Sequence, residues 1–330
     1  MDKQFDLITI GDSTVDTFIR IHDATVECDI NHKECKICVK YGDKIPVDSI
    51  AHGVAGNAAN VVVGCSRLGL RTAIYTNLGD DDHGKNIKQV LKGENVANDY
   101  IKVHSGKDSN LSVVLTFQGE RTIFVYHQDW NYHLPDLAAC SWVYLTSMAQ
   151  TFASSNIMDE VCHYIDKSRA KLAFGPGTYQ LAADIKRYPK LLEKCEVLIV
   201  NLEEAKKILG TDESELIDQR DLLARMHLLG PKTVVITDGA NGSYVSDGNR
   251  NLKIGIFPTK LVEKTGAGDA YAGGFLAALI SRMPLEEAMV WGAINAAHVI
   301  TKTGTQNGLL KKDELLKYRN KAKSFRAVNF

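Results

Sequence analysis

Short apolar runs rich in β-branched residues alternate with stretches of helical periodicity along most of this chain, which restricts the folds open to it. The runs that we expect to be strands are Leu7 to Ile10, Ala73 to Asn77, Trp142 to Leu145, Leu172 to Phe174, Val197 to Val200 and Thr233 to Thr237. The stretches that fit helices are 57–69, 84–92, 154–168, 202–209, 213–229, 269–281, 285–301 and 311–323. Strands that alternate with helices predict a doubly wound α/β fold, with a mainly parallel sheet flanked by helices.

Two polar segments, residues 12–50 and about 100–128, interrupt this alternation. They contain short alternating runs such as Ser112 to Phe117 and Thr122 to His127, and Gln118-Gly119-Glu120 between these two runs predicts a hairpin turn. Because both segments leave the early strands at their carboxyl ends, we expect a small β-sheet lid over the crevice where open α/β sheets bind ligands.

Composition narrows the class of protein further. The 330 residues, 45% of them hydrophobic, suffice for a sizeable core, and no linker divides them, so 1–330 is predicted to be a single domain. Thirty-nine basic and forty acidic residues leave a net charge of -1, which argues against nucleic acid or a membrane as partner. The sequence shows no signal peptide or membrane span, so we expect a cytoplasmic protein. Seven cysteines, an odd number, suggest free thiols in a reducing compartment.

The segment Thr265-Gly266-Ala267-Gly268-Asp269 precedes an apolar run that suits a buried helix. Glycines let successive backbone N–H groups point into one concavity, and the start of a helix adds partial positive charge, so this turn can hold an anion. Asp269 is then placed to accept a proton from an attacking hydroxyl during phosphoryl transfer. The alternative is that Asp269 only caps the helix and the glycines only allow a tight turn. The segment is neither a dinucleotide fingerprint nor a Walker loop.

Further motifs lie in order along the chain. They are Gly11-Asp12 with Asp16, Val54-Ala55-Gly56-Asn57-Ala58-Ala59-Asn60, Gly79-Asp80-Asp81-Asp82-His83-Gly84, Gly119-Glu120-Arg121-Thr122, Asn201-Leu202-Glu203-Glu204, Thr237-Asp238-Gly239-Ala240-Asn241-Gly242 and Asn295-Ala296-Ala297. Together with the 265–269 segment, this set resembles the ribokinase-like PfkB family of carbohydrate kinases over residues 7 to about 310. The resemblance implies the ribokinase-like form of the doubly wound fold, with a β-sheet lid.

The resemblance also implies roles for the phosphate-binding residues. Asp269 corresponds to the family's general base, and the amides of Gly266, Ala267 and Gly268 to its anion hole. Asn201 and Glu204 correspond to an Asn-x-x-Glu motif that positions Mg²⁺, Glu204 through water, on the nucleotide phosphates. Taken alone, that pair also suits a helix cap with an acid in the first turn.

For the nucleotide, the resemblance implies contacts from two further segments. Thr237, Gly239 and Gly242 are similar to the family's nucleotide loop, although Thr-Asp-Gly after a strand is also an ordinary turn. Asn295 is similar to a residue beside the adenine, although it is also an ordinary helix residue.

On the acceptor side, Asp16 resembles the family's acid that hydrogen-bonds sugar hydroxyls. Gly53, Asn57 and Asn60 belong to the turn that contacts the sugar, and short polar side chains of this kind suit the recognition of polyols. Asn57 is alternatively a helix cap. Arg121, in the hairpin of the lid, points toward substrate or phosphate in the functional interpretation and into solvent in the structural one.

The sequence departs from the family pattern at three places. His52-Gly53 replaces a glycine pair, which adds bulk to the acceptor pocket. Val54 replaces a lysine found in several members, which favours an acceptor without a phosphate group. Glu263-Lys264 replaces the Asp-Thr that helps to bind a monovalent cation in K⁺-activated members. This replacement argues against activation by K⁺, and whether the protein binds any monovalent cation is not decided by the sequence.

One cluster in the first lid segment falls outside the family pattern. Cys28, His32, Cys35 and Cys38 supply four soft ligands within a short stretch, a set that zinc accepts in tetrahedral sites. The alternative, which we favour, is that the cysteines are small apolar fillers.

We therefore expect an ATP-dependent, Mg²⁺-requiring kinase that phosphorylates a hydroxyl of a sugar-like acceptor. A nucleoside kinase of the same fold is the alternative among enzymes, and a catalytically weak nucleotide-binding regulator is the alternative of another class. The expected oligomeric state is a monomer or a homodimer formed through the lid.

Overall fold

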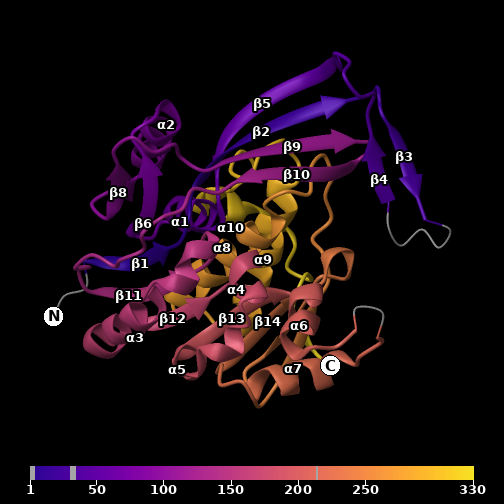
Figure 1. Ribbon diagram of the computed structural model, residues 1–330. Helices are drawn as coiled ribbons and strands as arrows, with labels where there is room; N and C mark the ends of the chain where they lie inside the picture. Colours follow the sequence, from indigo (N-terminus) through magenta and orange to yellow (C-terminus); the bar gives the residue numbers. More distant parts are fainter. Residues whose placement is uncertain (1–3, 30–34, 213–214) are drawn as a thin grey trace.

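The computed structural model describes residues 4–29, 35–212 and 215–330 (Figure 1). A large sheet with the order β17-β16-β15-β14-β13-β12-β11-β1-β6-β7, in which β8 also pairs with β6, forms the centre of the molecule. Its parallel strands are β1 (Phe5–Ile10), β6 (Thr72–Gly79), β7 (Val96–Ala97), β8 (Ile101–His104), β11 (Cys140–Leu145), β12 (Lys171–Phe174), β13 (Cys195–Asn201) and β14 (Thr233–Thr237). Antiparallel strands β15 (Ser243–Ser246), β16 (Asn251–Ile254) and β17 (Val328–Asn329) extend one edge.

Helices cover both faces of this sheet. In Figure 1, α3 (Ile157–Ser168), α5 (Pro189–Glu193), α6 (Leu202–Leu209) and α7 (Gln219–His227) lie in front of the sheet, and α8 (Ala267–Ile280), α9 (Leu285–Val299) and α10 (Lys312–Lys321) lie behind it. Alternate strand residues serve the two layers, since Trp142 packs in the core on the side of α8 and Val143 in the core on the side of α3. The doubly wound, mainly parallel fold is confirmed.

A second, four-stranded sheet with the order β10-β9-β2-β5 stands over the large sheet, and we call it the lid sheet. It consists of β2 (Thr14–Ile21), β5 (Val47–Ala55), β9 (Leu111–Phe117) and β10 (Glu120–Tyr126). Gln118 and Gly119, with φ of 50° and 85°, form the two-residue turn between β9 and β10, as the predicted hairpin requires. A two-stranded hairpin of β3 (Thr25–Cys28) and β4 (Cys35–Cys38) extends from the lid sheet.

The boundaries of several predicted elements are wrong. The lid sheet extends to Ala55, because the residues before α1 (Asn57–Arg67) continue the pairing of β5 with β2. Ile101–His104, predicted in the lid, pairs with β6 of the large sheet. The helix expected over 213–229 begins at Gln219, where Asp218 accepts a hydrogen bond from Arg220 N as its cap. The helix predicted over 84–92 is α2 (Asp82–Gly93). A short helix, α4 (Thr178–Ala182), was not predicted from the periodicity.

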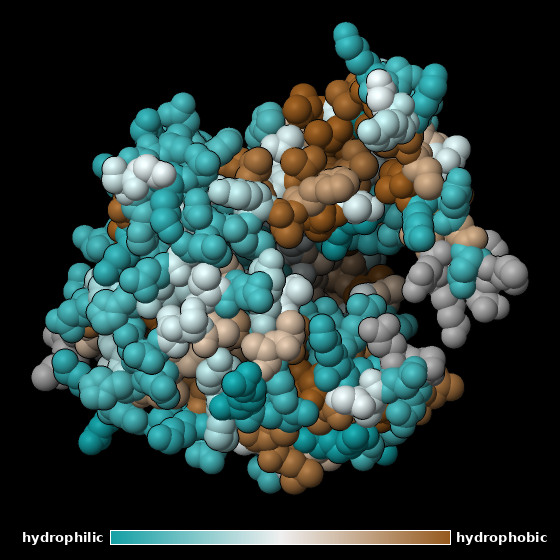
Figure 2. Space-filling view, viewed as in Figure 1, coloured by the Kyte–Doolittle hydropathy of each residue, from teal (hydrophilic) through white to brown (hydrophobic). Residues whose placement is uncertain are grey.

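Among the described residues, no helix combines the length and apolarity needed to cross a membrane. Exposed hydrophobic side chains gather on the lid sheet, above a recess between the lid and the body of the protein (Figure 2). The exposed ones on β5 and β10 are Val47, Ile50, Ile123, Phe124, Val125 and Tyr126, and because successive strand residues point to opposite faces, those on β10 lie on both faces of the sheet.

Candidate active site

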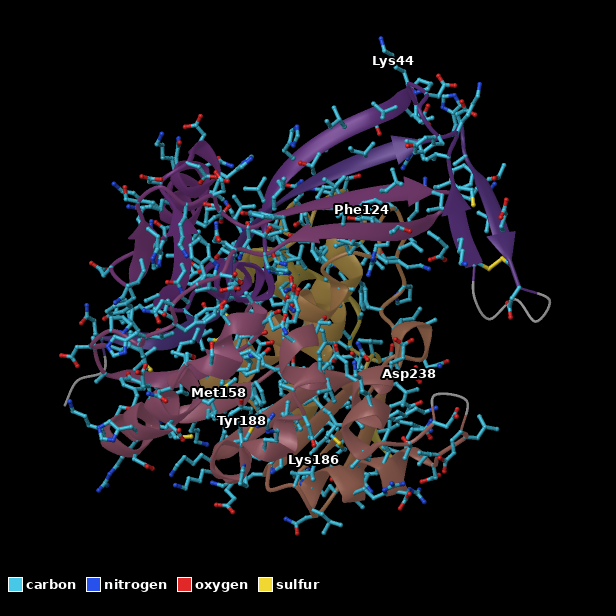
Figure 3. All side chains as sticks on the ribbon, viewed as in Figure 1. Lys44, Phe124, Met158, Lys186, Tyr188 and Asp238 are labelled. Carbon is cyan, nitrogen blue, oxygen red and sulfur yellow. A yellow bond between two sulfur atoms is a disulfide. The ribbon has the colours of Figure 1, made fainter. Side chains whose placement is uncertain are left out.

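The predicted phosphate-binding residues meet at the carboxyl ends of the central strands. Asn201 and Thr237 are register partners at the last position of β13 and β14. On the other side of the recess lies the lid sheet, and Figure 3 shows Phe124 on the lid and Asp238 on the body across from it. A pocket of about 350 Å³ lies between the tip of the lid and the loop that leads into α8, and Arg20, Gln118 and Glu263 are among its lining residues.

The glycine turn before α8 has the conformation that an anion-binding turn requires. Gly266 is the N-cap of the helix with φ of 85°, and a Cβ there would lie 3.0 Å from the backbone of Thr305. The first helical hydrogen bond runs from Ala270 N to Gly266 O at 2.9 Å. Ala267 N donates to Lys264 O at the long distance of 3.4 Å, and within the described residues no acceptor is recorded for Gly268 N. The start of α8 therefore presents free donors and partial positive charge to the recess.

Asp269 lies in the first turn of α8, three residues after the N-cap, so the alternative that it caps the helix is wrong. Its partly exposed carboxylate accepts a hydrogen bond of 2.7 Å from Asn60 Nδ2, and Asn57 also donates to it. Burial raises the pKa of Asp269 to about 6, against the lowering effect of these two donors. The carboxylate is thus oriented by α1 and is a stronger base than an ordinary aspartate.

Asn60 is buried, and both the oxygen and the nitrogen of its side-chain amide are hydrogen-bonded to protein. Its Oδ1 accepts from Thr305 Oγ1 at 2.8 Å and from Gln306 Nε2 at 3.2 Å, while its Nδ2 donates to Asp269. The predicted sugar contact of Asn60 is therefore not what the structure shows, because every polar atom of the amide group faces protein. Asn57 is the first residue of α1, after the N-cap Gly56, so its alternative interpretation as a cap is wrong as well.

Asp16 lies on β2, where its register partners are Gly53 on β5 and Ser112 on β9. The side chain is only 7% exposed, and its Oδ1 has no hydrogen-bond partner among the described residues. Burial raises the pKa of Asp16 to about 6, a hydrogen bond from Ser112 lowers it, and the charge of Asp269 raises it. The charges of Asp16 and Asp269 therefore repel each other across the recess. Asp16 Oδ1 is a buried acceptor that can receive a hydrogen bond from a ligand.

The nearby Asp12 is bonded to protein through one carboxylate oxygen, while its buried Oδ1, like that of Asp16, has no hydrogen-bond partner among the described residues. Its Oδ2 accepts from Tyr132 Oη at 2.7 Å and from Ala149 N at 2.8 Å. Burial raises the pKa of Asp12 to about 7.

Asn201 and Glu204 form a reciprocal capping box at the start of α6. Glu204 N donates to Asn201 Oδ1, and Asn201 N donates to Glu204 Oε2, both at 2.8 Å. Burial raises the pKa of Glu204, and the charge of Asp269 raises it further. The pair is thus a helix cap, as the alternative interpretation stated, and it also places a carboxylate within electrostatic range of Asp269.

The predicted nucleotide loop follows β14. Gly239 has φ of 48° and open space around its Cα, whereas Gly242 has φ of 92° and a Cβ there would lie 2.0 Å from Ile254 O. Gly242 is therefore required by the contact of its turn with β16, and Gly239 and the half-buried Thr237 remain the accessible members of the loop.

Asn295, predicted beside the adenine, is completely buried between helices. Its Nδ2 donates to Ala270 O at 2.8 Å and its Oδ1 accepts from Leu310 N at 3.1 Å. Both the oxygen and the nitrogen of the amide are bonded to backbone atoms, because a polar side chain buried between helices needs hydrogen-bond partners within the protein. Asn295 is therefore not free to contact a nucleotide.

Ion pairs join the tip of the lid to the loop before α8. Arg121 Nη1 lies 3.8 Å from Glu263 Oε1, and Lys264 Nζ donates to Glu120 Oε1 at 3.1 Å. Glu263 Oε1 also accepts from Thr265 Oγ1 at 2.8 Å. Arg121 is partly exposed, and its ion-pair partner is Glu263 in this loop. A contact of Arg121 with substrate or phosphate stays a prediction.

The cysteine cluster of the lid forms no set of thiolates. Cys28 and Cys35, opposite each other in the β3–β4 hairpin, are joined by a disulfide, and Cys38 is free. His32 lies outside the described residues. Within the ranges that the structure covers, no group of three His, Cys, Asp or Glu residues is placed to hold a metal ion. The zinc hypothesis and the expectation that these cysteines are free thiols are both corrected for Cys28 and Cys35, because adjacent strands bring the two sulfur atoms together.

Two residues of the site, Thr305 and Gln306, were missed by the sequence analysis. Both are buried polar residues in the segment Gly304-Thr305-Gln306-Asn307-Gly308, which follows an apolar helix and precedes a pair of leucines. A polar segment flanked by glycines between two apolar ones is the signal that would have drawn attention to them.

Comparison with known proteins places this architecture in a family. The model described as pfkB family carbohydrate kinase matches residues 19–312. The ribokinase of Haemophilus influenzae is 26% identical over 279 residues, which are 82% of this chain and 87% of that protein. Arabidopsis thaliana ribokinase, solved in complex with ribose and ATP, superposes with a TM-score of 0.78 at 21% identity, over 96% of this chain and 98% of that one. The nucleoside kinase of Methanocaldococcus jannaschii superposes at 0.76 with 20% identity, over 97% and 100%.

The large parallel sheet with its separate lid sheet is the fold of ribokinase-like kinases. The chain belongs to the pfkB family of carbohydrate kinases, whose model matches most of its length. It is therefore an enzyme, a sugar or nucleoside kinase of this family, and the resemblance carried by the sequence motifs is confirmed.

Proposed function

We propose that the protein transfers the γ-phosphoryl group of ATP to a hydroxyl of a sugar-like acceptor, with Asp269 as the general base. The observation that carries this proposal is the position of Asp269, a carboxylate held by Asn57 and Asn60 directly after the free amide of Gly268. An acceptor hydroxyl bound between Asp16 and Asp269 donates its proton to Asp269 as its oxygen attacks.

The pKa of Asp269 suits this step. A value of about 6 leaves the side chain ionised at neutral pH and makes it more basic than an ordinary aspartate. The unpartnered Oδ1 of Asp16 is available to accept from a second hydroxyl of the acceptor, which orients the first one toward Asp269.

The residues present fit Mg-ATP. The amide of Gly268 and the turn at Gly266 can receive a transferring phosphoryl group, since Gly268 carries no side chain and its N–H has no acceptor among the described residues. Asn201 and Glu204 supply the oxygen ligands that Mg²⁺ and its waters prefer, next to Thr237 and Gly239 for the phosphates and ribose. Bound Mg²⁺ neutralises charge on the phosphates, and the protein's part is to hold the base and exclude water.

The acceptor is a sugar in this proposal, and a nucleoside is the second candidate. The sugar is supported by the ribokinase relative, and the nucleoside by the likeness to the Methanocaldococcus nucleoside kinase. Asp16 with its unpartnered oxygen suits the vicinal hydroxyls that a free sugar and a ribose both carry.

Of the two expected oligomeric states, the exposed apolar side chains of the lid sheet favour the homodimer. Sedimentation of the wild type beside Phe124→Asp tests this, since a dimer through the lid becomes a monomer in the variant.

The function is tested by measuring ADP release from Mg-ATP with pentoses, hexoses, their phosphates and nucleosides, beside Asp269→Asn. Turnover with a neutral sugar that is lost in the variant supports the proposal. Selective turnover with a nucleoside would show that the acceptor is a nucleoside, the second candidate, and not a sugar. Binding of ATP without turnover on any acceptor indicates a nucleotide-binding regulator instead.

A further inference from the structure

The general base is held by a chain of hydrogen bonds that ends on a segment with no other assigned role. Asn60 donates to Asp269, and Thr305 and Gln306 both donate to Asn60 Oδ1. An amide side chain has a donor end and an acceptor end, so two donors on one side fix which end faces the other side. Thr305 and Gln306 thereby force the NH₂ group of Asn60 toward the carboxylate.

The segment 305–310 is itself held by two side chains from other helices, Arg67 and Asn295. Arg67 Nη1 donates to Gln306 O at 2.7 Å and to Leu309 O at 2.9 Å, while the same guanidinium is paired with Glu94. Asn295 accepts from Leu310 N and donates to Ala270 O, the residue after Asp269.

The same segment also shapes the anion turn. Thr305 is the residue that a Cβ at Gly266 would approach to 3.0 Å, so the two backbones are in close contact. One short segment thus touches the glycine turn directly and the general base through Asn60.

We infer that Thr305 and Gln306, acting through Asn60, are positioning residues for the general base, and that the segment 305–310 anchors the base and the anion turn in one arrangement. The inference rests on the proposed function of Asp269. Asn60, which the family resemblance assigned to the acceptor, is on this view part of the catalytic machinery and not of acceptor recognition.

The test is the pair Thr305→Val and Thr305→Ser. Valine keeps the shape of threonine and removes the hydroxyl donor, whereas serine keeps the donor. With valine we expect kcat to fall about tenfold or more, with KM for ATP and acceptor little changed, because a displaced base slows the chemical step and not binding. Serine is expected to restore most of kcat. Gln306→Met provides a second removal of a donor should the valine variant fail to fold.

The matched control is Thr72→Val. The Thr72 side chain is also buried, and its Oγ1 has no partner among the described residues. The same chemical change there is expected to leave kcat at the wild-type value.

A second readout needs no turnover and separates this inference from the proposed function. Loss of donation from Asn60 is expected to raise the pKa of Asp269, which NMR of ¹³C-labelled aspartate follows, with Asp269→Asn for assignment. The other titratable groups that face Asp269 are Asp16, Glu204 and Tyr144, and they are the same in every variant.

An upward shift of the Asp269 titration in the Thr305→Val or Gln306→Met variant, reversed in Thr305→Ser, supports the inference even if no acceptor has been found. An unchanged titration overturns it, whether or not kcat has fallen, because a merely structural loosening would not act on the carboxylate.

Discussion

Asn60 and Asp269 lie 209 residues apart in the chain and are joined by a hydrogen bond of 2.7 Å. Asn60 belongs to α1 and Asp269 to the first turn of α8, and the two helices pack together, with Cys65 Sγ of α1 donating to Gly273 O of α8 at 3.4 Å. The orientation of the Asp269 carboxylate therefore depends on the packing of two buried helices and on the donors to Asn60 from Thr305 and Gln306, which keep the carboxylate in place before substrate arrives.

Asp269→Asn is expected to lower kcat about a thousandfold, within the range that a general base contributes. Asparagine keeps the size of the side chain and an acceptor oxygen for Asn60, so binding of ATP is expected to persist. Steady-state kinetics and calorimetric titration with nucleotide measure the two effects. A variant that retains more than a tenth of wild-type turnover would show that the proton leaves by another route.

The raised pKa of Asp269 makes a prediction about stability. A folded-state pKa of about 6, above the ordinary value of 3.8, means that ionising the group opposes folding. This destabilisation is absent below the unfolded pKa of 3.8, develops as the pH rises from there to the folded pKa of about 6, and is complete above it. Asp269→Asn removes it, so the variant is expected to gain melting temperature over the wild type at about pH 8 and to gain little at about pH 4. An equal gain at both pH values contradicts the assigned pKa.

Gly266 and Gly268 are expected to differ when each is replaced by alanine. At Gly266 the positive φ and the backbone of Thr305 oppose a Cβ, so the free energy of unfolding is expected to fall by about 1–3 kcal/mol. The displaced turn is also expected to lower kcat about a hundredfold, as for loss of an oxyanion donor. At Gly268 a Cβ meets nothing within 4 Å, so Gly268→Ala is the control and is expected to fold as stably as the wild type. Chemical denaturation measures the free energy of unfolding of both variants, and steady-state kinetics measures their kcat. Equal losses in the two variants would contradict the prediction.

Much of this arrangement was predictable from local pattern. The alternation of strands and helices indicated the sheet, and the glycine turn with Asp269 indicated an anion site, because both depend on residues close together in the sequence. The partners of Asn60 were not predictable, since Thr305 and Gln306 are more than 240 residues away from it in the chain. Asn295 was misassigned because periodicity does not distinguish a polar residue at a helix–helix contact from one that faces a ligand.

The disulfide in the lid hairpin predicts a count of thiols. Unfolded protein without reductant is expected to react at five cysteines and reduced protein at seven, since only Cys28 and Cys35 are paired. Elemental analysis of the purified protein is expected to find less than about a tenth of an equivalent of zinc, because a disulfide sulfur is not a thiolate ligand. Seven reactive thiols without reductant, together with stoichiometric zinc, would restore the metal hypothesis for Cys28, His32, Cys35 and Cys38.

The observed role of Glu204 as a helix cap and its proposed role as a Mg²⁺ ligand through water can be separated experimentally. Glutamine at this position still accepts from Asn201 N in a capping box, so Glu204→Gln is expected to leave the melting temperature nearly unchanged. It removes the negative charge, and the Mg²⁺ concentration for half-maximal activity is expected to rise about tenfold, as for other outer-sphere partners of metals. The adjacent exposed Glu203, in the same first turn of α6, is the matched control, and Glu203→Gln is expected to leave the Mg²⁺ dependence unaltered. If both variants keep the wild-type Mg²⁺ dependence, Glu204 serves only as a cap, and the metal must be held by phosphate and water alone.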